Sequence, residues 1–111
     1  MKLKSTTSGH ILLGACVAKQ GRFSEAKAHQ RRAIDLATPG HAVDEAHLNL
    51  GLVLRAEGRY KTAEMHFAKA LQLDPKYRAA REGLRDVRGA LKLANNERHR
   101  KRPAQSKKRR R

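Results

Sequence analysis

The sequence predicts an all-α fold, in which two helical hairpins are followed by one further helix. Apolar residues recur at the spacing of helices, and Gly and Pro interrupt that spacing at regular intervals. In addition, the first third of the chain is repeated in the second at a distance of 37 residues. The 111 residues have room for one small domain, and the 39% of hydrophobic residues, without Trp, predict a modest core. No apolar run reaches 18 residues, so no membrane span is expected.

The most regular stretch covers residues 44–77, and its pattern predicts two helices joined by a tight turn. Leucines recur there too closely, and over too long a stretch, for a strand. Gly58 can end the first helix in the left-handed region, and Pro75 cannot continue the second. The apolar stripe of the second helix consists of Ala63, Phe67, Ala70 and Leu71.

Gly51 lies inside the first of these helices, where a glycine costs about 1 kcal/mol relative to alanine. Such a cost implies a packing reason. We expect Gly51 to face Ala63 at the closest approach of the two helices, with Tyr60 and Phe67 on either side.

This stretch resembles the tetratricopeptide repeat family, with His47 at a position where that family often carries Trp. The resemblance rests on nine residues at the family's offsets: Leu50, Gly51, Leu54, Gly58, Tyr60, Ala63, Phe67, Ala70 and Pro75. It implies antiparallel helix-turn-helix repeats stacked as a short α-solenoid. It also implies a protein-binding adaptor or scaffold, whose groove is lined by the first helix of each repeat.

A second, weaker copy of the repeat covers residues 7–43, after an N-terminal extension at residues 1–6. It departs at Gln30, where the second copy has Phe67, and it ends in a longer connector that contains Pro39 and Gly40. The matched residues are His10, Leu13, Gly14, Val17, Gly21, Phe23, Ala26 and Ala33, each 37 positions before its counterpart.

After the two hairpins one further helix is predicted at residues 78–96, and this terminal helix, with its polar outer face, would cap the stack. One face carries an apolar stripe, and a neighbouring face carries a basic stripe. Residues 97–111 hold nine Lys or Arg and one acid without apolar periodicity, so this tail is predicted to be disordered when free. The whole chain has a net charge of +16, of which residues 76–111 contribute +12.

The groove predicted from the resemblance is an apolar strip with one charge of each sign, and Ser8 and Glu45 lie along it beside the candidate binding residues. Its residues are Ile11, Ala15, Ala18, Leu48, Leu52 and Arg55. A peptide or partner helix is the expected ligand. Alternatively, the strip meets the terminal helix at residues 78–96, a missing repeat or a partner subunit. Self-association around Ile11, Leu48 and Leu52 would make the protein a homo-oligomer.

The basic residues of the terminal helix and the tail support a second hypothesis, in which the protein binds nucleic acid or another polyanion. The tail has no aromatic residue for base stacking, so such binding would not depend on nucleotide sequence. A targeting signal and a merely solubilising tail are alternatives. The candidate residues are Arg78, Arg81, Arg85, Arg88, Lys92, Arg98, Arg100, Lys101, Arg102, Lys107, Lys108, Arg109, Arg110 and Arg111.

No motif in the sequence indicates an enzyme, a cofactor or a metal site. There is no Gly-rich phosphate loop, nucleophile motif or tight cluster of metal ligands. His10 and His47 are equivalent positions of the two copies, as are His29 and His66. The apolar run before Cys16 is too short for a signal peptide. The sequence names no compartment, and an intracellular, cytoplasmic location is the expectation. Cys16 itself is expected to be partly buried.

Overall fold

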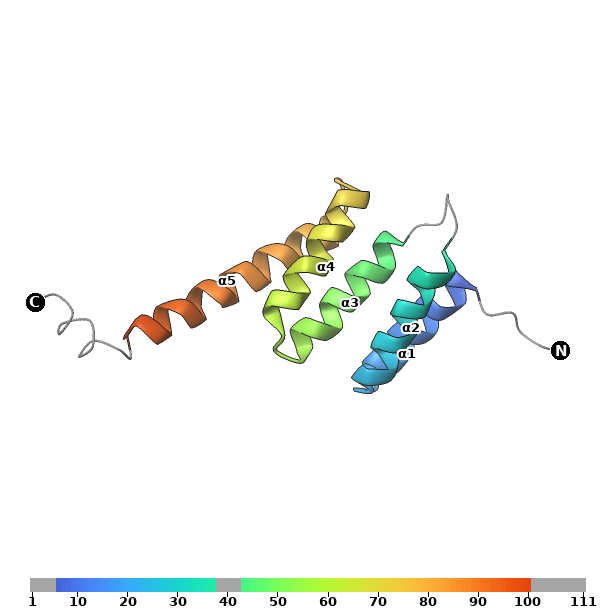
Figure 1. The fold of residues 1–111 in the computed structure, drawn as a ribbon, viewed down its shortest axis with the longest axis horizontal. Coiled ribbons are helices and arrows are strands. Elements are labelled where there is room, and N and C mark those ends of the chain that lie inside the picture. Colours follow the sequence, from blue (N-terminus) through green and yellow to red (C-terminus); the bar gives the residue numbers. More distant parts are fainter. Residues whose placement is uncertain (1–5, 38–42, 101–111) are drawn as a thin grey trace, which may run out of the picture.

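The structure is a computed structural model that describes residues 6–37 and 43–100 (Figure 1). The described residues form five α-helices and no strand, which confirms the predicted all-α fold. The helices are α1 (Thr7–Lys19), α2 (Phe23–Leu36), α3 (Asp44–Ala56), α4 (Tyr60–Leu73) and α5 (Arg78–Arg100). Among these helices, none is both long and apolar enough to cross a bilayer.

The turn residues end the helices where the sequence pattern predicted. Gly21 and Gly58 have φ values of 79° and 80°, a region that glycine enters without steric cost. Thr6 caps the start of α1, because its side chain accepts a hydrogen bond from the Gly9 N–H at 2.9 Å. Asp74 takes an extended conformation just before Pro75, which fixes the end of α4.

The helices form two antiparallel hairpins, α1–α2 and α3–α4, and α5 packs against α4 and α3 (Figure 1). Each helix lies beside its neighbour in the sequence, so the chain advances in one direction from α1 to α5. This is the stacked arrangement of a short α-solenoid.

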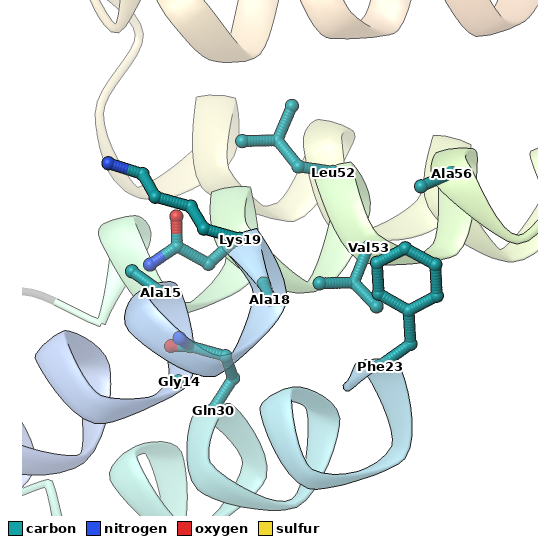
Figure 2. Close-up of a pocket in the computed structure, with 10 residues that line it drawn as sticks. Gly14, Ala15, Ala18, Lys19, Phe23, Gln30, Leu52, Val53 and Ala56 are labelled. Atoms are coloured by element: carbon teal, nitrogen blue, oxygen red, sulfur yellow. The ribbon is translucent and has the colours of Figure 1, made fainter. Parts of the chain in front are cut away.

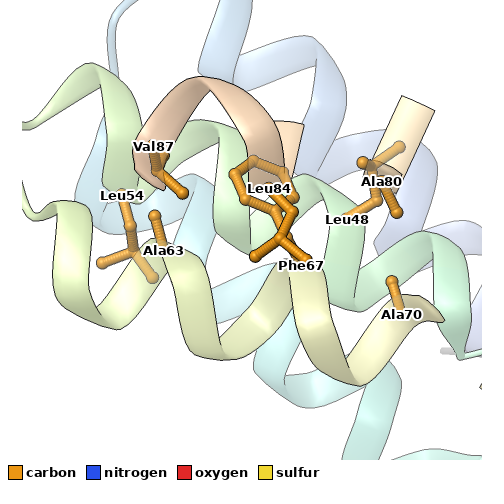
Figure 3. Close-up of a cluster of buried hydrophobic side chains, with 8 residues drawn as sticks. All are labelled: Leu48, Leu54, Ala63, Phe67, Ala70, Ala80, Leu84 and Val87. Atoms are coloured by element: carbon orange, nitrogen blue, oxygen red, sulfur yellow. The ribbon is translucent and has the colours of Figure 1, made fainter. Parts of the chain in front are cut away.

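The main core lies between the second hairpin and α5 (Figure 3). Its buried side chains are Leu48, Leu54, Ala63, Phe67, Ala70, Ala80, Leu84 and Val87. A smaller cluster of Ile11, Ala33 and Ala46 joins the two hairpins. Ala80, Leu84 and Val87 of this core come from α5, so α5 covers the second hairpin on the side away from the first.

Gly51 has the predicted packing role, but its neighbour is Phe67 rather than Ala63. A Cβ added at Gly51 would lie 2.7 Å from the fully buried Phe67 ring. A Cβ at Gly83 of α5 would lie 2.5 Å from the same ring. Phe67 is thus held between two glycines on different helices, a contact that involves three helices instead of two.

Gln30 occupies the corresponding place in the first hairpin and is fully buried. Its Nε2 donates a hydrogen bond to the Ile11 carbonyl at 3.1 Å, whereas its Oε1 has no partner among the described residues. A Cβ at Gly14 would lie 2.3 Å from this Nε2. The close contact of Gly51 with Phe67 is therefore repeated in the first hairpin by Gly14 and Gln30, with an amide in place of the aromatic ring.

Helix α5 continues to Arg100, four residues beyond the predicted boundary at residue 96. Residues 97–100 are helical rather than disordered, because no Gly or Pro follows Gly89 until Pro103. The rest of the predicted tail, residues 101–111, lies outside the described residues, as do residues 1–5 and the connector at 38–42.

Candidate functional site

A pocket of about 300 Å³ lies between α1 and α3 (Figure 2). Ala15 and Ala18 of α1 line one side, and Leu52 and Val53 of α3 line the other. The remaining lining residues are Gly14, Lys19, Phe23, Gln30, Asn49 and Ala56. The volume is at the lower end of those that hold small ligands, which are roughly 300–1,000 Å³.

The sequence creates this pocket through small residues at a helix contact. Ala15 and Ala18 face α3 with only a methyl group each, so the two helices leave space between them. Phe23, the first residue of α2, closes one end, and Lys19 and Asn49 add polar groups to the lining. The pocket can therefore accept an apolar side chain and contact polar groups beside it.

Three of the six predicted groove residues, Ala15, Ala18 and Leu52, line this pocket. Ile11 and Leu48 do not line it and are only 7% and 8% exposed. Ile11 packs between the hairpins and Leu48 packs in the main core, so the prediction placed two core residues on the accessible surface.

The sixth predicted residue, Arg55, pairs with Asp86 of α5 at 3.1 Å. The predicted groove did not contain seven of the residues that line the pocket: Gly14, Lys19, Phe23, Gln30, Asn49, Val53 and Ala56. One of them could have been found from the sequence. Phe23 is equivalent to Tyr60, which was expected to pack beside the first helix of its hairpin, and both residues begin the second helix of a hairpin.

The basic stripe of α5 lies on the surface. Arg78, Arg81, Arg85 and Lys92 are exposed, and none forms an ion pair within the described part of the chain. Arg88 differs, because its Nε contacts Glu64 of α4 at 3.0 Å. Arg98 is also exposed. Arg100 ends α5, and Lys101 and the later candidates lie beyond the described residues.

Histidines pair within each hairpin rather than between repeats. The Nδ1 atoms of His10 and His29 are 3.0 Å apart, and those of His47 and His66 are 3.1 Å apart. Each pair shares one hydrogen bond, in which one ring donates and the other accepts. The two histidines of each pair are 19 residues apart in both copies of the repeat, and this equal spacing was the signal in the sequence. Across residues 6–37 and 43–100, no three His, Cys, Asp or Glu residues form a group that could hold a metal ion.

Burial lowers the pKa of His47 from 6.5 to about 4, and the nearby His66 and Lys69 reinforce this effect against the opposing charge of Asp44. Burial also lowers the pKa of His66, with a further contribution from Arg31. Both rings of this pair are therefore neutral near pH 7.

Comparison with known proteins gives one assignment. No curated protein matches the chain. The family model described as tetratricopeptide repeat matches residues 6–76, which cover both hairpins and more than half of the chain. Such repeats generally mediate protein–protein interactions and are typically non-enzymatic. From the match and the stacked hairpins, we conclude that the chain belongs to the tetratricopeptide repeat family.

Proposed function

We propose that this protein is an adaptor that binds a peptide or partner helix through the pocket between α1 and α3. The observation that carries the proposal is the apolar lining of the pocket by Ala15, Ala18, Leu52 and Val53. Burial of one Leu- or Phe-sized side chain contributes about 1.5–3 kcal/mol. Because association itself costs several kcal/mol, further contacts along the bound segment must supply the rest.

The charges near the pocket favour an acidic residue beside the apolar anchor. Lys19 lines the pocket and has no carboxylate partner among the described residues. Arg55 is already paired with Asp86, so it adds less free positive charge. The expected ligand is therefore an extended or helical segment with one large apolar side chain and a neighbouring Asp or Glu.

Selection from a displayed library of random linear peptides tests this function. The full chain should enrich peptides with the expected pattern, and Leu52→Asp should weaken their binding at least tenfold. Leu52 is partly exposed, so this change should leave the fold intact. The matched control is Met65→Asp, which introduces the same charge at an exposed site on α4 away from the pocket.

Two results would count against groove binding. One is the absence of any enriched peptide from the full chain. The other is a peptide that binds wild type and Leu52→Asp equally, since its contacts would then lie elsewhere on the protein.

A second candidate function is sequence-independent binding to nucleic acid through the basic stripe of α5. It is favoured by the four exposed basic residues, Arg78, Arg81, Arg85 and Lys92, that have no ion-pair partner among the described residues. Binding of this kind releases counterions and weakens steeply with salt. A titration of a random DNA duplex at several salt concentrations tests it, with the tail-deleted protein as the comparison.

A further inference from the structure

Helix α5 packs on the hairpins with one face and leaves its basic stripe exposed on another. The face that packs contains the buried residues Ala80, Gly83, Leu84 and Val87. The stripe contains four exposed cations that have no ion-pair partner among the described residues: Arg78, Arg81, Arg85 and Lys92. Their intervals of three, four and seven residues place them along one line of the helix surface.

Gly89 lies on the same line, four residues after Arg85 and three before Lys92. It is exposed, and a Cβ added there would meet nothing within 4 Å. Gly51 and Gly83 differ, because an added Cβ at either position would strike the buried Phe67 ring. The backbone does not require a glycine at position 89 either, since its φ is not positive.

A glycine inside a helix costs about 1 kcal/mol relative to alanine, and no contact within the described chain explains this one. Glycine also occurs where a ligand must approach the backbone closely. Gly89 has a cation of the stripe on either side, at Arg85 and Lys92, so the molecule that approaches it there should be negatively charged.

We propose that the basic stripe of α5 lies in the major groove of duplex DNA, with Gly89 at the point of closest approach. The proposal rests on the second candidate function, nucleic-acid binding by α5, and it names the duplex and the groove.

The dimensions of the helix favour this groove. An α-helix with its side chains is about 10–12 Å wide, and the major groove of B-DNA is about 12 Å wide. The stripe from Arg78 to Lys92 is about 21 Å long, which corresponds to about six base pairs. The long Arg and Lys side chains can then contact the phosphates along the groove edges. Duplex RNA is a poorer fit, because its major groove is deep and narrow.

The surroundings of the stripe are compatible with a bound duplex. Residues 92–98 are all exposed, and this part of α5 projects from the hairpins (Figure 1). The acids of α5 do not interrupt the stripe, since Glu82 and Glu97 lie beside its line and Asp86 is paired with Arg55.

Fluorescence anisotropy with the full chain tests the proposal. A random DNA duplex and an RNA duplex of the same sequence and length are compared in about 50 mM NaCl, where electrostatic binding is strong. The DNA duplex should bind several-fold more tightly. Attraction to phosphates alone would not favour DNA, because the two duplexes carry the same number of phosphates. Polyglutamate, added as a competitor at equal charge, should displace the DNA poorly.

Gly89→Leu adds bulk to the stripe without changing its charge. It should weaken binding to the DNA duplex by about tenfold, because the side chain holds the helix away from the groove. Its melting temperature should not fall, since leucine is the better helix former, so weaker binding cannot be attributed to unfolding. The matched control is Ala94→Leu, which adds bulk at an exposed position nine residues after Arg85, on the opposite side of the helix. This variant should bind DNA like wild type.

The outcomes separate the groove from the function on which it rests. If wild type binds neither duplex, nucleic-acid binding itself is refuted, and the groove with it. If it binds DNA but Gly89→Leu binds equally well, or if Ala94→Leu loses as much affinity, the stripe is not in the groove although the function stands. Equal affinity for DNA and RNA, or efficient displacement by polyglutamate, would show a surface that attracts any polyanion and would overturn the proposal.

Discussion

Phe67 is fully buried, and its ring lies between Gly51 of α3 and Gly83 of α5. An aromatic ring is rigid and cannot bend away from a new side chain. A Cβ less than 3 Å from the ring therefore requires a helix to shift. At the residue scale, this one contact limits how closely α5 can approach the second hairpin.

Two glycines of α5 should respond in opposite directions to substitution by alanine. Gly83→Ala places a Cβ 2.5 Å from the Phe67 ring, and overpacking of this kind costs about 1–3 kcal/mol. Gly89→Ala meets nothing within 4 Å, so it should gain up to about 1 kcal/mol from helix propensity. Thermal unfolding should show a melting temperature several degrees lower for Gly83→Ala and several degrees higher for Gly89→Ala. Destabilisation of similar size in both would refute this packing account.

The His47–His66 pair gives the fold a dependence on pH. Near pH 7 one neutral ring donates to the other across 3.1 Å. When both rings are protonated, each Nδ1 carries a hydrogen, so the hydrogen bond is lost and the two charges repel. Because the pKa of His47 is about 4 in the folded chain and near 6.5 when unfolded, the unfolded state binds more protons between these values.

Stability should therefore be constant above about pH 7 and fall as the pH drops from 6.5 toward 4. At pH 5 protonation of His47 should lower the free energy of unfolding by on the order of 1 kcal/mol, because solvent reaches part of this ring and weakens the effect. Melting temperatures measured at pH 7.5 and pH 5.5 test this, and the difference between them should shrink in His47→Leu, which cannot titrate. An equally large difference in that variant would assign the pH dependence to other groups.

At the scale of elements, the sequence predicted where helices end better than which faces they expose. The left-handed Gly58 and the break at Pro75 depend on the local backbone alone. Residues 97–100 are the exception. Their charge indicated disorder, yet a helix already begun continues through polar residues until a breaker occurs.

Exposure depends on neighbours that a repeat pattern does not specify. Leu13 and Leu50 are equivalent positions, but Leu13 is 51% exposed and Leu50 is 0% exposed. Helix α3 has helices on both sides, whereas α1 has described neighbours on one side only. Cys16 was expected to be partly buried, but its place on the outer face of α1 exposes it. The same limit explains why the predicted groove included Ile11 and Leu48, which the structure buries. The sequence does not give the angle at which the hairpins stack, and that angle decides which side chains are covered.

In the whole molecule, an apolar surface and a basic surface lie at opposite ends. Apolar, nearly uncharged α1 lies at one end, and α5 with its basic stripe projects at the other (Figure 1). The pocket lies near the apolar end, between α1 and α3. Partner binding in the pocket and polyanion binding on α5 would therefore not compete for space, and separate substitutions can test each.

If α5 binds nucleic acid, the ion pairs of the structure predict which arginines contribute most. Arg81 has no ion-pair partner among the described residues, so Arg81→Gln should reduce the slope of log affinity against log salt by about one for a random DNA duplex. Arg88→Gln should reduce it less, because Glu64 already neutralises Arg88 at 3.0 Å. Deletion of residues 101–111, which hold seven Lys or Arg, should remove most of the slope. Binding to the duplex is measured by fluorescence anisotropy. Equal low-salt affinity of the full and tail-deleted chains, with no effect of Arg81→Gln, would exclude nucleic acid as a ligand of this surface.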